Sequence, residues 1–390
     1  MSHRRARALG VVRRRRRVHA SDAGRTGVRP PLCAAPGPRR RPVELPGSRR
    51  PRGAGPRPRA PRRREVRGAT ERGVRTRLRA DTHRRRGRRP RAPRRGRPLP
   101  TPRGTAGGVS VAGGLVVGAS GFLGRAVAAE LREGGHRVVG TYCSTPGPEA
   151  SVQFDFWMDD VGTLVGEHDV DAVVFAAAVE YGGEADTGEA ATGPDFERAA
   201  ERFVAGCTDR RLVYVSSAAV FDGSEGRYAE DADRSPVDEY GRRLATMEDL
   251  VEATCRDAAI LRTSYLFGFS AGRLDDRLAR TREAVTAGDA VAYFTDMYKS
   301  PLAVTEAAET VRVLVESGAT GVVHAPAQRT SIYEFHHDAI RTLGYDASLV
   351  ERDAIPEDGE FAVDRSLSSD RFESLVGFEP SGVTDALGDT

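Results

Sequence analysis

The stretch from residue 113 to residue 142, GGLVVGASGFLGRAVAAELREGGHRVVGTY, constrains the fold of this chain more than any other. A short apolar run enters a glycine-rich turn, an amphipathic pattern of helical period follows, and a second apolar run begins after Gly134-Gly135. The turn contains three evenly spaced glycines, Gly118, Gly121 and Gly124. In this strand–turn–helix–strand context, such glycines let the backbone approach a pyrophosphate at the helix N-terminus, so the segment predicts a dinucleotide-binding turn.

The end of the second predicted strand indicates which dinucleotide is bound. It reads Tyr142-Cys143-Ser144, without an acidic side chain. An Asp or Glu here would hydrogen-bond the ribose of NAD and repel the additional phosphate of NADP. NADP(H) is therefore favoured, and NAD(H) stays open because this loop also lacks an arginine.

Three more β-rich apolar runs follow at 152–156, 171–178 and 211–217, separated by helical or loop stretches. Alternating β and α units of this kind predict an α/β fold of the Rossmann type, a doubly wound parallel sheet. We expect the folded domain to span residues 111–390.

Residues 1–110 have an opposite composition. They hold 36 arginines, no lysine, five acidic residues and 15 of the 23 prolines, but no aromatic residue, which gives a formal charge of +31. Such a segment lacks the apolar surface that would offset the entropy of ordering it, so we expect a disordered arm. For its origin, a start assigned too early, with the true chain beginning near Val109 or Val111, is favoured over a genuine basic tail. Nucleic-acid binding by the arm is a weaker interpretation, since no aromatic side chain is present to stack on bases.

The remaining 280 residues carry a formal charge of −26 and a single lysine, Lys299. A surface this acidic stays hydrated in strong salt, which leads to the hypothesis of a salt-adapted, halophilic protein. Four widely spaced cysteines argue against a zinc site or a disulfide framework and favour a reducing compartment. Without an apolar run long enough for a membrane span or a secretory signal, we expect a soluble cytoplasmic protein.

The segment VYVSSAAVFDGSEGRYAEDADRSPVDEYGR at 213–242 resembles the extended short-chain dehydrogenase/reductases, most closely the dTDP-4-dehydrorhamnose reductase family. Three further segments, at 261–268, 299–304 and 321–340, are similar to segments of that family in the same order. The resemblance implies a Rossmann domain with a small C-terminal substrate lobe, mainly from 265–300 and 325–390. It also implies reduction of a nucleotide-activated 4-keto-deoxy sugar by NAD(P)H, and a homodimer is one assembly we consider.

The same resemblance implies the site residues. Tyr240 matches the tyrosine that donates a proton to the carbonyl oxygen, and Ser217 matches the residue that orients that carbonyl. Val220 and Tyr265 are expected near the substrate. The residues expected to bind the cofactor are Gly118, Ser120, Gly121, Phe122, Leu123, Gly124, Tyr142, Asp155, Phe156, Ala176, Ala177 and Ala178. No metal site is expected.

The chain departs from the family in its Tyr-x-x-x-Lys motif. Leu244 stands four residues after Tyr240, where the lysine that lowers the pKa of the tyrosine belongs, and Lys299 is distant in the sequence. Arg243 is a candidate substitute, although a solvated surface arginine is the favoured interpretation. The departure leaves an alternative function open, that of a catalytically silent dinucleotide-binding regulatory protein, for which the family offers a precedent in a regulatory subunit of methionine adenosyltransferase.

Overall fold

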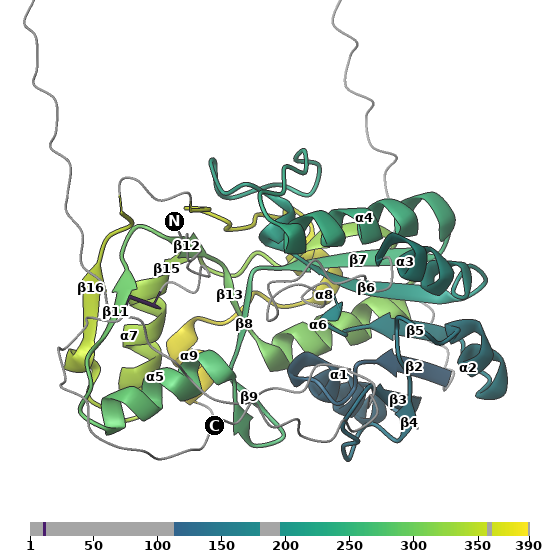
Figure 1. Cartoon of the computed structure of the whole chain (residues 1–390), viewed down its shortest axis with the longest axis horizontal. Coiled ribbons are helices and arrows are strands. Elements are labelled where there is room, and N and C mark those ends of the chain that lie inside the picture. The colour runs from purple at the N-terminus through teal and green to yellow at the C-terminus, as the bar shows by residue number, and fades with distance from the viewer. Residues whose placement is uncertain (1–10, 13–112, 180–195, 357–360, 389–390) are drawn as a thin grey trace, which may run out of the picture. The chain divides into compact units, whose positions relative to one another are not determined.

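The structure is a computed structural model that describes residues 11–12, 113–179, 196–356 and 361–388 (Figure 1). The arm predicted to lack a fold, residues 1–110, lies outside the described residues with one exception. Val11–Val12 (β1), for which no strand is predicted, pairs antiparallel with Val291–Phe294 (β11).

The core of the molecule is a seven-stranded, fully parallel sheet, which confirms the predicted fold class. Its order is β14-β7-β6-β5-β2-β3-β4. The strands are β2 (Gly113–Val117), β3 (Arg137–Tyr142), β4 (Val152–Gln153), β5 (Ala172–Phe175), β6 (Arg211–Ser217), β7 (Ala258–Thr263) and β14 (Gly321–His324). The strand order reverses between β2 and β5, and ligands of such sheets bind beyond the carboxyl ends of the strands at this reversal.

Helices cover both faces of the sheet (Figure 1). One face packs against α1 (Phe122–Glu133) and α6 (Val304–Ser317), and the other against α2 (Val161–Glu167), α3 (Phe196–Ala205) and α4 (Glu239–Thr254). Along β2, successive side chains enter opposite cores, as strand geometry requires. Burial on both faces explains why these strands read as nearly continuous apolar runs in the sequence.

A second lobe begins after β7. It has two cores of its own, one around Phe267 and Phe335 and the other around Tyr293 and Ile340. In it β11 pairs with β16 (Val350–Asp353), β8 (Tyr265–Phe267) with β13 (Pro301–Ala303), β9 (Phe269–Ser270) with β10 (Arg273–Leu274), and β12 (Tyr298–Lys299) with β15 (Thr330–Ser331). Its helical segments are α5 (Asp276–Thr286), α7 (Ile332–Thr342), η3 (Ala347–Leu349) and α9 (Val383–Gly388).

Two local features of the C-terminal part connect the lobe with the sheet. Helix α7 begins with a capping box between Ser331 and Glu334, as the sequence pattern of this segment favours. The short helix α8 (Phe372–Val376) returns to the sheet, where Phe372 enters the same core as α1 and α6.

The cysteines differ from the expectation in one respect. Cys143 is disulfide-bonded, whereas the sequence argues against disulfides. Cys207 and Cys255 are free and buried, and burial raises the pKa of the Cys255 thiol to about 11. Among the described residues, no helix is long and apolar enough to cross a membrane.

Candidate active site

The glycine turn after β2 has a backbone that other residues cannot adopt easily. Gly118 has a φ of +86°, and a Cβ atom there would lie 2.7 Å from the Cα of Ala177. A Cβ atom on Gly124 would lie 2.1 Å from the carbonyl oxygen of Gly118. The turn is therefore in close contact with the residues that follow β5, and these glycines are required by geometry.

The start of α1 provides donors for an anion. Gly121 is the N-cap and gives no side-chain hydrogen bond, and the first turn of the helix contains no acidic residue. The Nε of Arg125, also in the first turn, is buried without a hydrogen-bond partner among the described residues. This site fits a dinucleotide pyrophosphate, because it offers amide groups at the helix start and a guanidinium nitrogen without a hydrogen bond. The glycine turn adds the space that a Cβ atom would fill, which we call the glycine cradle.

The other predicted cofactor residues are distributed around this turn. Ser120, Phe122, Tyr142, Ala176 and Ala177 are half-buried and Ala178 is exposed, so their side chains are accessible. Leu123 and Phe156, in contrast, are core residues whose side chains are 8% and 4% exposed. They offer a cofactor their backbone groups, and their binding of a cofactor stays a prediction. The carboxylate of Asp155 accepts a hydrogen bond from the backbone N–H of Trp157 and stabilises its own turn.

Ser217 and Tyr240 come from adjacent elements at the carboxyl end of β6. Ser217 is the last residue of β6, and its Oγ accepts a hydrogen bond from Ala219 N at 3.2 Å, which caps the short helix η2 (Ala218–Val220). Tyr240 is the second residue of α4, beside Gly241, where a Cβ would lie 2.3 Å from the carbonyl oxygen of Ala219. The structure thus brings the first turn of α4 against η2, which Ser217 caps. In the sheet, β5 separates β6 from β2, the strand that leads into the glycine turn.

The position of the missing lysine is part of the core. Leu244 is 1% exposed and packs among the side chains that hold α4 to the sheet. Arg243 forms an ion pair with Glu239 at 3.2 Å, and its guanidinium lies 5.5 Å from the ring centre of Phe196 on α3. These contacts give Arg243 a role in packing α4 against α3.

The two residues predicted near the substrate are placed differently. Val220 is fully buried in the sheet core, so its side chain does not reach a substrate. The ring of Tyr265 packs edge-on against Phe335 and its hydroxyl lies 3.4 Å from Nε2 of His336, inside the lobe. Burial raises the pKa of Tyr265. Both side chains pack against cores, which a single sequence does not reveal, and contact of Tyr265 with a substrate stays a prediction.

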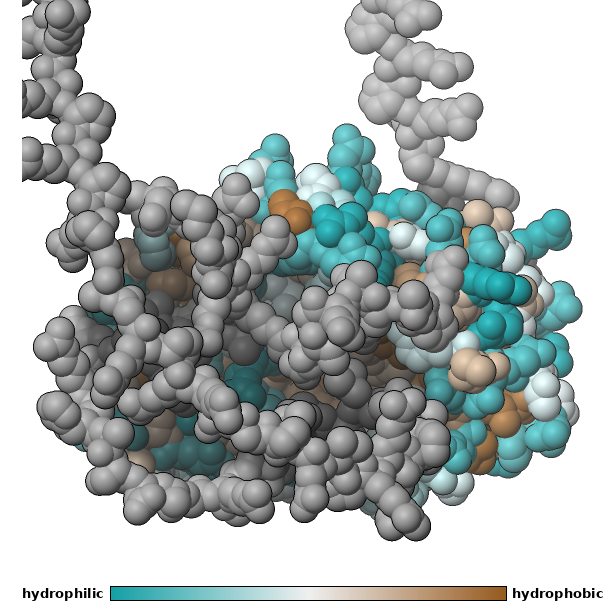
Figure 2. All heavy atoms as spheres, in the orientation of Figure 1, coloured by the Kyte–Doolittle hydropathy of each residue, from teal (hydrophilic) through white to brown (hydrophobic). Residues whose placement is uncertain are grey.

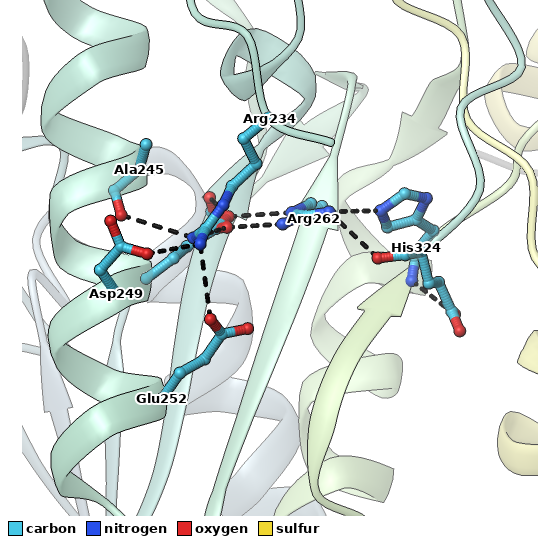
Figure 3. Close-up of polar contacts among 9 residues, drawn as sticks. Arg234, Ala245, Asp249, Glu252, Arg262 and His324 are labelled. Atoms are coloured by element: carbon cyan, nitrogen blue, oxygen red, sulfur yellow. Dashed lines mark hydrogen bonds and ion pairs between the residues drawn. The ribbon is translucent and has the colours of Figure 1, made fainter. Parts of the chain in front are cut away.

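A buried polar network fixes α4 to the sheet (Figure 3). The carboxylate of Glu248, which is fully buried on α4, accepts hydrogen bonds from Ser216 Oγ at 2.5 Å, from Arg262 Nη2 at 2.6 Å and from Arg234 Nη1 at 3.0 Å. Ser216 is the neighbour of Ser217 on β6, and Arg262 belongs to β7. This network was not predicted, although a glutamate within the apolar face of α4 is a sequence signal for it.

The network continues to β14 through His324. Arg262 Nη1 donates to Nε2 of His324 at 3.1 Å, so the imidazole is neutral and its Nδ1 donates to the carbonyl of Tyr228 at 3.0 Å. Burial, helped by the charge of Arg262, lowers the pKa of His324 to about 4. His336 is likewise buried, and the part of the chain described by the structure contains no cluster of three potential metal ligands.

Comparison with known families identifies the family of this chain. Residues 114–389 match the model of the family described as RmlD substrate binding domain. The chain belongs to the RmlD family. This confirms the resemblance seen in the sequence.

Individual relatives of this RmlD-family chain agree. A probable low-salt glycan biosynthesis reductase of Haloferax volcanii is 34% identical to it over 248 residues. The match covers 61% of this chain and 82% of the relative. A dTDP-4-keto-6-deoxy-D-glucose reductase of Streptomyces niveus is 33% identical to the chain over 255 residues. That match covers 63% of this chain and 82% of the relative. The crystal structure of a dTDP-4-dehydrorhamnose reductase from Bacillus anthracis in complex with NADP shares the fold, with a TM-score of 0.60, 18% identity, and coverage of 72% of this chain and 98% of that one.

Removing the charge of Glu248 should destabilise the protein strongly. Glu248→Gln leaves the buried Arg262 without its counter-charge, and we expect the free energy of unfolding to fall by about 3–5 kcal/mol. Asp249→Asn is the matched control, because Asp249 pairs with the same Arg234 but its side chain is 66% exposed, so about 1 kcal/mol or less is expected. Urea denaturation of both variants measures the difference, and equal effects would contradict the importance of the buried carboxylate.

Acid should weaken the fold through His324. Its pKa is about 4 in the folded protein against an ordinary 6.5, so the unfolded state binds the proton more readily as the pH falls from 6.5 to 4. We expect a loss of up to about 3 kcal/mol over this range. His324→Gln should flatten this part of the profile of unfolding free energy against pH. A slope identical to that of the unchanged protein would show that another group is responsible.

Proposed function

We propose that this RmlD-family protein is an NAD(P)H-dependent reductase of a nucleotide-activated 4-keto-deoxy sugar. The observation that carries the proposal is that two candidate sites lie along the carboxyl edge of one parallel sheet, separated only by β5. There the glycine cradle after β2 is followed along the sheet edge by Ser217 at the end of β6 and Tyr240 at the start of α4. The named activities of the two relatives support the same reaction class.

The chain's own residues would act on the sugar carbonyl as follows. The bound nicotinamide supplies a hydride to the carbonyl carbon, so negative charge develops on the oxygen. The hydroxyl of Ser217 orients this oxygen by hydrogen bonding, and the phenol of Tyr240 donates the proton that completes the alcohol. Because Leu244 replaces the motif lysine, no ammonium group at that position promotes ionisation of Tyr240. A neutral phenol serves reduction better than the reverse oxidation.

The end of β3 supports NADPH as the preferred donor. Tyr142 closes this strand, and the following Cys143-Ser144 adds no carboxylate that would repel a ribose phosphate. The unpaired Nε of Arg125 adds a donor beside the turn. The substrate in this proposal is a nucleotide sugar. A homodimer is the assembly we consider with it.

Tyr240→Phe tests the assigned proton donor. With NADPH and a dTDP-4-keto-6-deoxy sugar, we expect the variant to lose at least about a hundredfold in kcat, because the ring remains but no proton is available. Cofactor binding, followed by NADPH fluorescence, should be unchanged. Tyr345→Phe removes a hydroxyl from an exposed tyrosine and serves as the control.

The same assay separates the reductase from the silent regulator. The burial of Leu244 in the core is the observation that favours the second function, since the motif lysine is truly absent from the site. Tight NADPH binding without oxidation, across a panel of dTDP- and UDP-linked keto sugars, would overturn the reductase and support a regulatory protein.

A cytoplasmic location and salt adaptation are further proposals. The strongly acidic composition from residue 111 onward supports the second, and Figure 2 shows hydrophilic side chains over most of the coloured surface in that view. Salt would screen repulsion among the acidic side chains.

Salt adaptation predicts a higher melting temperature in concentrated KCl. We expect a rise of about 5 °C or more between dilute buffer and about 1 M KCl, where charges are screened beyond roughly 3 Å. Near-UV circular dichroism follows this part alone, because every aromatic residue lies after residue 110. Equal stability in both buffers would remove the hypothesis.

A further inference from the structure

In the C-terminal half, β12 and the segment 363–367 run side by side. Tyr298 on β12 forms a parallel bridge with Asp364, its N–H donates to the carbonyl of Val363 at 2.7 Å, and its carbonyl accepts from Arg365 N at 3.1 Å. Two residues further on, Ser300 Oγ accepts from Leu367 N at 3.1 Å. This continuous pairing fixes the register of the two segments.

The register sorts their side chains onto two sides. On one side Arg329 lies over the ring of Tyr298 at 3.4 Å and donates to the carboxylate of Asp364 at 2.7 Å. The next pair in register, Lys299 and Arg365, faces the opposite side, since side chains alternate along paired segments. Two positive side chains therefore lie next to each other.

This pair lacks sufficient negative charge. The guanidinium of Arg365, 12% exposed, donates from Nε to the carbonyl of Phe221 at 2.8 Å. Its Nη2 lies 3.6 Å from Asp238 Oδ2 and is buried without a hydrogen bond among the described residues. Burial and the charge of Arg365 lower the pKa of the half-buried Lys299 to about 7, against the opposing influence of Asp364 and Asp238.

The pair is also next to the predicted catalytic residues. Phe221 directly follows η2, which Ser217 caps. Asp238 is the N-cap of α4 and accepts from Gly241 N at 2.7 Å, with Tyr240 between them in the chain. The N-terminus of α4 is already capped by the Asp238 carboxylate, so a further anion at this place is favoured by the guanidinium nitrogen without a hydrogen bond and by the neighbouring amine.

We propose that Lys299 and Arg365 form a clamp that binds the diphosphate of the nucleotide-sugar substrate and sets the sugar against Ser217 and Tyr240. This inference rests on the proposed function and names the lobe residues that recognise its substrate. A diphosphate would provide an oxygen acceptor for Nη2 of Arg365, which has an ion-pair contact with Asp238 but no hydrogen bond among the described residues, and further negative charge for the two adjacent cations. The nucleoside itself carries no such charge.

Binding of non-reacting nucleotide sugars tests the clamp directly. UDP-glucose and dTDP-glucose are titrated into the full chain by calorimetry, because their diphosphate has no proton to lose near neutral pH. At pH 6.5 we expect Lys299→Gln and Arg365→Gln each to weaken binding by roughly ten- to a hundredfold, the usual effect of losing a charge-assisted hydrogen bond. Uridine and thymidine should bind weakly and equally to all variants.

The control is Arg341→Gln, which removes one positive charge from α7 in the lobe at a side chain that is 62% exposed. It should leave the affinity for both nucleotide sugars unchanged. A loss as large as that of Lys299→Gln would show a general charge effect and overturn the clamp. So would an unchanged affinity in Lys299→Gln.

A conservative variant distinguishes the clamp from a purely structural role. In the unchanged protein, affinity should fall as the pH rises from 6.5 to 8.5, because Lys299 loses its proton. Lys299→Arg should bind at least as tightly and show little pH dependence, since a guanidinium keeps its charge. A fall of equal steepness in Lys299→Arg would contradict the assignment.

The outcome is separable from that of the proposed function. If the protein oxidises NADPH with a keto sugar but Lys299→Gln keeps the affinity of the unchanged protein, the reductase stands and the clamp fails. If neither UDP-glucose nor dTDP-glucose binds the unchanged protein, the clamp is overturned, and the oxidation assay alone decides the reaction.

Discussion

The carboxylate of Glu248 is the group on which the geometry of the candidate site depends. It is fully buried and joins α4 to β6 through Ser216 and to β7 through Arg262. A buried charge that loses its partners is costly, so α4 cannot slide along the sheet without breaking all three hydrogen bonds. Tyr240 lies two helical turns before this anchor, and Ser217 is the next residue after Ser216. One interaction therefore holds both predicted catalytic residues in register.

The glycine turn fixes the other side of the site in a different way. Its constraint is steric, because the backbones of Gly118 and Ala177 approach too closely for a Cβ atom at residue 118. The predicted cofactor turn and the two predicted catalytic residues are thus positioned by independent means, close packing in one case and a buried charge network in the other. The parallel sheet connects them, since β5 lies between β2 and β6.

The sequence predicted the parts of this arrangement that are encoded locally. The strand–turn–helix with its glycines, the alternating β and α units and the position of Tyr240 all follow from patterns within a few tens of residues. The packing of Val220 and Tyr265 against cores was not predicted, because whether a side chain turns toward a core or a ligand depends on elements far away in the chain. Lys299 was set aside as distant for the same reason, since only the pairing of β12 with residues 363–367 brings it near Asp238.

Leu244 explains why positive charge near the site has to come from elsewhere. Its side chain fills the core between α4 and the sheet, where an ammonium group would have to be desolvated without a partner. The lobe supplies Lys299 and Arg365 instead, on segments held together by their own backbone hydrogen bonds. In the proposed clamp, this positive charge from the lobe lies near Asp238 and serves the substrate diphosphate, not the ionisation of Tyr240. Substrate binding and the positioning of the sugar for reduction then depend on the same two side chains.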